Sequence, residues 1–179
     1  MAKAKQQQSQ LFSDMPANKA GVFPPTRYQG SKYKILNWID YHTKDLKFDS
    51  VLDAFGGTGC VGYMFKKKGK QVFYNDFLKF NHYVGLAIIE NSKIILSDED
   101  VDFIFKKHPK IKYPTFIYDT FNDIYFTDEE NEWLDVVIAN IERLKNEYKQ
   151  ALAYYVLFQA CIIKRPYNLF HRKNLYIRT

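Results

Sequence analysis

A glycine-rich turn is the first group of residues that could do chemistry. Residues 57–62 read Gly-Thr-Gly-Cys-Val-Gly and fit the pattern G-x-G-x-x-G letter for letter. Glycines allow a tight turn of the backbone and let a ligand approach where a side chain would obstruct it. The pattern predicts a site for a nucleoside-containing cofactor. The alternative is a purely structural turn between a strand and a helix.

Two carboxylates flank this turn and indicate which cofactor it would take. Asp76 follows Asp53 by 23 positions, at the end of the next predicted strand, where it can accept hydrogen bonds from both hydroxyls of a ribose. Asp53 stands four positions before Gly57, and its charge would repel the pyrophosphate of a dinucleotide. S-adenosylmethionine has no phosphate and carries an ammonium and a sulfonium group, so the acids favour it over NAD. In the structural alternative, Asp53 only caps the helix.

The elements that must position these residues are a strand, a helix and a second strand. An apolar run predicts the first strand over 50–55. Apolar residues on one face predict a helix over 60–68 that ends at Gly69, and a second strand follows over 71–75. This order favours a parallel sheet and hence an α/β fold.

The rest of the chain is predicted to be largely helical. Ser31 and Ser97 are the expected N-caps of two helices, and Thr127-Asp-Glu-Glu130 is a capping box. The helices expected after the second strand span 77–91, 98–107, a segment that begins at Thr127, and 151–163.

Composition narrows the class of protein. A chain of 179 residues with 46% hydrophobic residues can build one packed domain, which excludes a wholly disordered or collagen-like protein. Its two cysteines have no partners at metal-ligand spacing, so neither a disulfide framework nor a metal site is expected. No apolar run approaches the roughly 20 residues that span a bilayer, and the sequence predicts a cytoplasmic protein without membrane contact. Residues 1–22 are polar and are expected to form a flexible leader.

Three motifs in order resemble those of a known enzyme family. They are Arg27-Tyr-Gln-Gly-Ser-Lys32, Asp53-Ala-Phe-Gly-Gly-Thr-Gly59 and Tyr74-Asn-Asp76. Together they are similar to the opening half of the Dam-like, alpha-group N6-adenine DNA methyltransferases. The resemblance implies a partial Rossmann-like, S-adenosylmethionine-dependent methyltransferase fold with helical additions in its second half, and a cofactor-binding domain over 23–163.

The resemblance also implies a role for each matching residue. Tyr28 would pack on or beside the cofactor, and Lys32 would contact it or order the loop around it. Asp53 would face the methionine amino group, and Asp76 would hold the ribose. The pocket would be shaped by Phe55, Gly57 and Gly59.

One motif of the family has no counterpart in this chain. Amino-methyltransferases carry Asp/Asn/Ser-Pro-Pro-Tyr/Phe, which accepts hydrogen bonds from the target amino group and stacks on the flipped base. The single Pro-Pro pair here, Pro24-Pro25, lies ahead of the glycine turn between Phe23 and Thr26. The catalytic residues therefore stay unassigned. The expectation is a truncated enzyme, or one subunit of a split enzyme whose second polypeptide supplies the motif.

A basic segment over 164–179 is the expected DNA contact. It contains no acid, and aromatic residues lie between its cations. Cations neutralise phosphates and release counterions, while aromatic rings stack on exposed bases. A solvated basic tail is the alternative. The contacts to double-stranded DNA are expected from Lys164, Arg165, Arg172 and Lys173.

The leading hypothesis from the sequence is a site-specific DNA adenine-N6 methyltransferase. It would transfer a methyl group from S-adenosylmethionine to adenine in a restriction-modification system, and the chain would be its cofactor-binding half. Two alternatives stay open: a non-catalytic DNA-binding module with a degenerate methyltransferase fold, and an NAD-dependent oxidoreductase.

Overall fold

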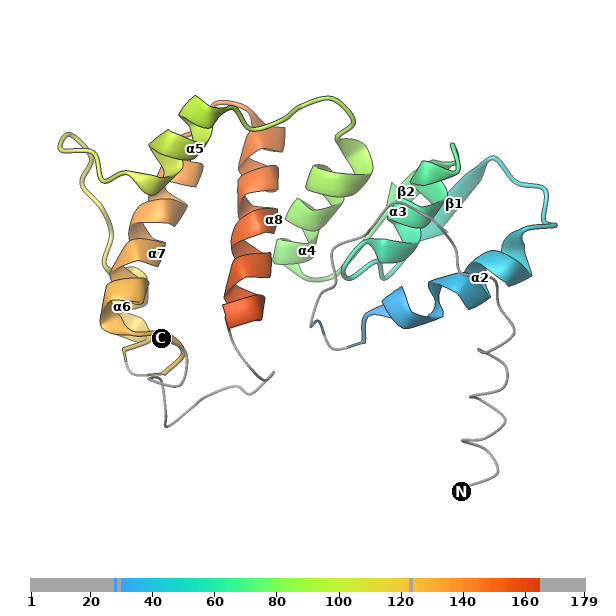
Figure 1. The fold of residues 1–179 in the computed structure, drawn as a ribbon, viewed down its shortest axis with the longest axis horizontal. Coiled ribbons are helices and arrows are strands. Elements are labelled where there is room, and N and C mark those ends of the chain that lie inside the picture. The colour runs from blue at the N-terminus through green and yellow to red at the C-terminus, as the bar shows by residue number, and fades with distance from the viewer. Residues whose placement is uncertain (1–27, 29, 123, 165–179) are drawn as a thin grey trace, which may run out of the picture.

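The computed structural model describes residue 28, residues 30–122 and residues 124–164. The expected leader over 1–22 lies outside the described residues, so the predicted domain boundaries stay predictions. Within them, Figure 1 shows a helix-rich molecule with one small sheet. The elements in chain order are η1 (Lys32–Ile35, a 3₁₀ helix), α2 (Leu36–Thr43), β1 (Ser50–Asp53), α3 (Cys60–Lys67), β2 (Gln71–Tyr74), α4 (Lys79–Val84), η2 (Gly85–Glu90, a π-helix), α5 (Asp98–Phe105), α6 (Phe116–Thr120), α7 (Asp128–Ile141) and α8 (Glu147–Lys164).

The predicted strand, helix and strand are present, and their sheet is parallel. β1 pairs with β2 from Ser50 opposite Gln71 to Asp53 opposite Tyr74. α3 forms the crossover and ends at Lys67, shortly before Gly69, whose φ of 75° is the left-handed conformation that glycine adopts without strain. The expected α/β unit is therefore confirmed, and it brings the carboxyl ends of both strands to the same edge.

A second layer of helices forms the larger part of the core. α7 packs against α5, α6 and α8, and Val137 and Ile141 of α7 are almost completely buried there. α8 lies between α4 and α7 (Figure 1). On its other side Ala151 and Tyr155 pack against Val84 and the rest of the α4–η2 segment. α8 therefore joins the sheet half of the molecule to the helical half.

The predicted helices are present, but one of them is divided and two differ in their ends. The segment 77–91 is split into α4 and η2, and the helix expected over 98–107 ends at Phe105. The last helix begins at Glu147 rather than at 151, since Asn146 Oδ1 accepts the N–H groups of Tyr148 and Lys149. Among the described residues, no helix is both long and apolar enough to cross a membrane.

Candidate functional site

The glycine turn connects β1 to α3 in a backbone conformation that requires glycine at two positions. Gly57 has a φ of 53° and Gly59 a φ of 73°, and Gly59 is the N-cap of α3. The N–H of Gly59 donates to the carbonyl of Gly56 at 2.9 Å, which closes the turn. These are the first and second glycines of the predicted pattern, and left-handed φ values explain both.

Asp53 lies at the end of β1 beneath this turn and is buried. Its Oδ2 accepts the N–H of Gly62, in the first turn of α3, at 3.1 Å. This hydrogen bond is the helix-capping role of the structural alternative. Gly62 has little room for a side chain, since a Cβ there would lie 3.1 Å from Ile89 and 3.2 Å from Val72.

Burial raises the pKa of Asp53 above its ordinary value of 3.8, and the nearby negative charge of Asp76 adds to this rise. The Gly62 N–H and the positive charge of Lys32 oppose it. Among the described residues, no lysine or arginine lies within ion-pair distance of Asp53. The carboxylate is thus desolvated without a paired cation, an arrangement that a cationic ligand group would relieve.

Asp76 follows β2 and holds the glycine turn from the other side. Its Oδ2 accepts the Gly57 N–H at 2.8 Å, while Oδ1 accepts the N–H of Leu78 at 3.0 Å and the side-chain amide of Asn81 at 2.9 Å. Partial burial acts to raise the pKa of Asp76, but the donation from Asn81 and from backbone amides outweighs it and lowers this pKa. Asp76 therefore keeps its negative charge down to a lower pH than Asp53 does.

The segment before α2 reaches the same turn. Lys32 Nζ donates to the carbonyl of Phe55 at 3.3 Å, and the Ser31 and Thr58 hydroxyls lie 3.3 Å apart. The Tyr28 ring lies against the turn, since a Cβ on Gly57 would be 3.7 Å from its Cε1. The segment that carries Tyr28 and Lys32 therefore lies against the glycine turn.

Asn81 is a site residue that reasoning from the sequence missed. It lies in α4 with 1% of its surface exposed, and its amide donates to Asp76 and, at 3.4 Å, to the Tyr28 hydroxyl. Its Oδ1 is buried without a hydrogen-bond partner among the described residues. An asparagine within an apolar helical pattern is the signal that could have found it.

Two aromatic side chains at this edge face solvent. Phe55 is 77% exposed and Phe77 is 92% exposed. The structure thus brings Tyr28, Lys32, Asp53, Gly57, Gly59 and Asp76 together around one loop, while the predicted pocket residue Phe55 contributes its backbone carbonyl and leaves its ring outside. Of the expected DNA contacts, Lys164 ends α8, and Arg165, Arg172 and Lys173 lie outside the described residues.

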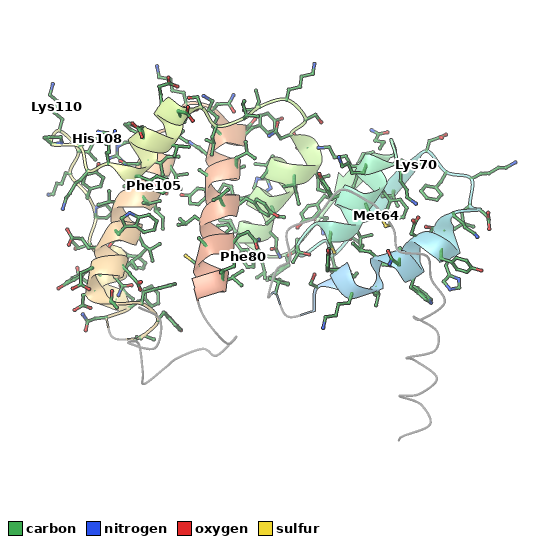
Figure 2. All side chains as sticks on the ribbon, in the orientation of Figure 1. Met64, Lys70, Phe80, Phe105, His108 and Lys110 are labelled. Atoms are coloured by element: carbon green, nitrogen blue, oxygen red, sulfur yellow. The ribbon has the colours of Figure 1, made fainter. Side chains whose placement is uncertain are left out.

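An aromatic row leads from this site into the helical core. The Tyr28 ring lies 6.1 Å from Phe80, and Phe80 meets Phe158 of α8 edge-on at 5.9 Å. Figure 2 shows Phe80 in the space between α4 and α8. Ring contacts therefore connect Tyr28, at the glycine turn, with α8 through Phe80.

Comparison with known proteins gives matches along most of the chain. The family described as D12 class N6 adenine-specific DNA methyltransferase matches residues 28–171. The Type II methyltransferase M2.HphI of Haemophilus parahaemolyticus is 41% identical over 150 residues, which cover 83% of this chain and 43% of the relative. M.NlaIII of Neisseria lactamica is 30% identical over 140 residues, which cover 73% of this chain and 42% of the relative. M.FokI of Planomicrobium okeanokoites is 30% identical over 138 residues, which cover 68% and 21%.

The chain spans less than half the length of each of these relatives. No solved structure matches it.

Proposed function

Because the chain belongs to the D12 class of N6 adenine-specific DNA methyltransferases, we propose that it forms the S-adenosylmethionine-binding part of an enzyme that methylates adenine N6 in DNA. The observation that carries this proposal is the meeting of Asp53, Asp76 and Tyr28 at one glycine turn. The names of the relatives, which are Type II methyltransferases, support a place in a restriction-modification system.

The chemistry of the donor set fits this cofactor. Two carboxylates lie at the turn, and one of them, Asp53, is buried without a paired cation among the described residues and would repel a pyrophosphate. The cofactor instead offers an ammonium and a sulfonium, which acids stabilise. The negative charge of Asp53 therefore disfavours the NAD-dependent alternative.

Each residue has a separate task in this proposal. Asp53 would lie toward the amino group of the methionine moiety, and Asp76 would accept the ribose hydroxyls. Phe77, exposed and adjacent to Asp76, offers an apolar surface on which an adenine ring can stack. Lys32 fixes the turn through the Phe55 carbonyl. The bound cofactor would supply an activated methyl group, and these residues hold and orient it.

Asp76 already accepts hydrogen bonds from Gly57, Leu78 and Asn81. A carboxylate offers about four acceptor positions. A ribose that binds through both hydroxyls therefore requires one of these protein donors to share its acceptor. Cofactor binding would thus be coupled to the donors that hold Asp76, one of which is the Gly57 amide of the turn.

The target adenine needs a binding motif of its own. Pro24-Pro25 is the sole Pro-Pro pair of the 179 residues and precedes the turn, so it does not match the catalytic motif. We propose that the target amino group is bound by a Pro-Pro-Tyr motif outside these 179 residues, on the same polypeptide or on a second one.

Isothermal titration calorimetry with S-adenosylmethionine, its demethylated product and NAD tests the cofactor proposal. Wild-type protein should bind the first two and not NAD. Asp76→Ala should weaken this binding roughly tenfold or more, because the ribose loses a charged acceptor. Asp45→Ala, which removes an exposed acid elsewhere, is the matched control. Wild-type protein that binds neither compound, or an Asp76→Ala variant that binds like the control, would contradict the proposal.

A further inference from the structure

A basic loop between α5 and α6 has no part in the site described above. Residues 106–113 read Lys-Lys-His-Pro-Lys-Ile-Lys-Tyr, and no acid occurs between Asp102 and Asp119. We propose that this loop binds the phosphate backbone of duplex DNA. The proposal rests on the proposed function, since it names a surface through which that enzyme would hold its substrate.

The backbone of this loop is fixed by buried polar groups. The Tyr113 hydroxyl accepts the N–H of His108 at 2.9 Å and donates to Asn140 Oδ1 at 3.0 Å. The side-chain amide of Asn140, which is fully buried, donates to the carbonyls of Phe103, Ile104 and Lys106. The loop therefore leaves the end of α5 in a defined direction.

Further contacts bring the His108 side chain inward. Its ring stacks on Phe103 with centroids 4.5 Å apart, and its Nε2 lies 2.9 Å from the Phe103 carbonyl. The Ile111 N–H donates to the His108 carbonyl at 3.0 Å, which forms a turn, and Pro109 restricts the backbone inside it. A loop held in this way loses little conformational entropy when it binds.

The lysines of the loop point outward, and two of them are available for a ligand. Lys106 pairs with Asp102 at 2.6 Å and Lys107 with Glu132 at 2.8 Å, both in exposed pairs. Lys110 and Lys112 are exposed and have no ion-pair partner among the described residues. Figure 2 shows Lys110 at the outer edge of the molecule, directed away from the helices.

Charge and shape favour a nucleic-acid backbone as the partner. Lysines separated by one residue on a rigid loop present two cations to successive phosphates, and each contact releases condensed counterions. The loop offers its cations without an exposed base-reading side chain between them, since Ile111 is partly buried. Such a contact positions a duplex without reading its sequence.

The test measures binding of a short fluorescent DNA duplex by anisotropy over a series of salt concentrations. Lys110→Ala with Lys112→Ala should weaken binding and reduce the slope of log K against log salt by about one per lysine. The control variant, Lys47→Ala with Lys93→Ala, removes the same charge from exposed lysines elsewhere and should keep the wild-type slope. Equal losses in both double variants would overturn the proposal, because total charge would then explain them.

Two further arms separate duplex binding by a positioned loop from general attraction to polyanions. Tyr113→Phe keeps all lysines but removes both hydrogen bonds of the hydroxyl, and it should weaken duplex binding if the loop must be held in place. Heparin and single-stranded RNA serve as competitors. The proposal would also be overturned if binding of these polyanions depended on Lys110 and Lys112 while binding of the duplex did not.

Calorimetry with S-adenosylmethionine is independent of the loop. A chain that binds the cofactor but no DNA contradicts this inference alone, and one that binds DNA through the loop but no cofactor contradicts the proposed function.

Discussion

At the scale of single residues, Asp53 and Asp76 show how two similar acids acquire different properties. Asp53 is buried with one backbone donor, and its pKa is raised. Asp76 accepts from two backbone amides and from Asn81, and its pKa is lowered. Asp53 is therefore suited to a cationic partner that compensates its desolvation. Asp76 is suited to accept hydrogen bonds from hydroxyl groups, because its carboxylate stays charged.

Asn81→Ala should weaken S-adenosylmethionine binding about tenfold, because Asp76 and Tyr28 lose their common donor. The pKa of Asp76 should rise in this variant. As pH falls, Asp76 is protonated sooner and binding should fail at a higher pH than in wild-type protein. Calorimetry over a pH series measures this shift.

The control for Asn81→Ala is Asn131→Ala. Asn131 is an equally buried asparagine in α7, which donates to the Phe121 carbonyl and likewise has an Oδ1 without a partner among the described residues. It should cost a similar amount of stability without changing the pH profile of binding. Identical pH profiles in both variants would mean that Asn81 acts only through packing.

Asp53→Asn should stabilise the protein while it weakens cofactor binding. The asparagine oxygen can still accept the Gly62 N–H, and the cost of a buried charge is removed. Because the pKa of Asp53 is raised in the folded state, its contribution to stability is fully present below the unfolded value near 3.8 and is lost as pH rises through the folded value.

The difference in unfolding free energy between Asp53→Asn and wild-type protein should therefore be small at pH values below 3.8 and grow as the pH is raised. Urea denaturation at several pH values measures it. A variant that is less stable than wild type at neutral pH would show that the charged form of Asp53 contributes to folding.

At the scale of elements, one tyrosine side chain fits between two glycines. The Tyr74 ring occupies the space where a Cβ on Gly56 would lie, and a Cβ on Gly85 would be 2.6 Å from its Cδ1. The Tyr74 hydroxyl donates to the Gly57 carbonyl at 2.7 Å. β2, the glycine turn and the start of η2 are thus fitted together through this ring.

Gly56→Ala and Gly85→Ala should each destabilise the fold by about 1–3 kcal/mol, because the added methyl overlaps a packed ring. In a Tyr74→Leu background both costs should fall sharply, since the ring is gone. Denaturant unfolding of the singles and doubles gives the coupling. Gly30→Ala, with no neighbour near its Cβ but a φ of 84°, should cost the same in both backgrounds. Costs that do not depend on Tyr74 would contradict the packing explanation.

Local signals predicted the elements whose limits are set by their own residues. The expected cap at Ser97 and the expected capping box at Thr127 are present, and Gly69 follows the end of α3. The end of α5 could not be predicted, because the carbonyls of its last turn are taken by Asn140, a residue far along the chain. The same holds for α6, whose first amides donate to the buried carboxylate of Asp135.

The residues of the candidate site also fall into those that the sequence predicts and those that it does not. The glycine turn, Asp53 at the end of β1 and Asp76 after β2 could be predicted, because the spacing of a βαβ unit fixes them along the chain. Asn81 could have been noticed as a polar residue in an apolar helical pattern, but its two contacts, one to Asp76 and one to Tyr28, are made in space and could not be predicted. The basic loop at 106–113 was also missed. Its lysines carry no motif, and Asn140 and Tyr113 hold it only in the folded chain.

At the scale of the whole molecule, α8 contributes to both parts of the core. Ala151 and Tyr155 pack with the α4–η2 segment, while Tyr154 and Leu157 pack with α5 and α7. The aromatic contact of Phe80 with Phe158 extends this connection to Tyr28, at the glycine turn. The two halves should therefore unfold together rather than as separate domains.

The two tryptophans of the chain allow this expectation to be measured, because one lies in each half. Trp38 is in α2 beside His42, and Trp133 is in α7 stacked on Phe105. Trp38→Phe leaves Trp133 as the single fluorescent probe, and Trp133→Phe leaves Trp38. In each variant the urea midpoint from tryptophan fluorescence should equal the midpoint that circular dichroism gives for the same variant.

S-adenosylmethionine at about 100 times its dissociation constant should then raise the unfolding free energy by about 2.7 kcal/mol at both probes. This holds even at Trp133, which lies in the half opposite the glycine turn (Figure 1), because a ligand of a single cooperative unit stabilises all of it. A cofactor shift at Trp38 with none at Trp133 would show that α8 does not couple the two halves. The absence of a shift at both tryptophans, with the common midpoint preserved, would instead count against cofactor binding.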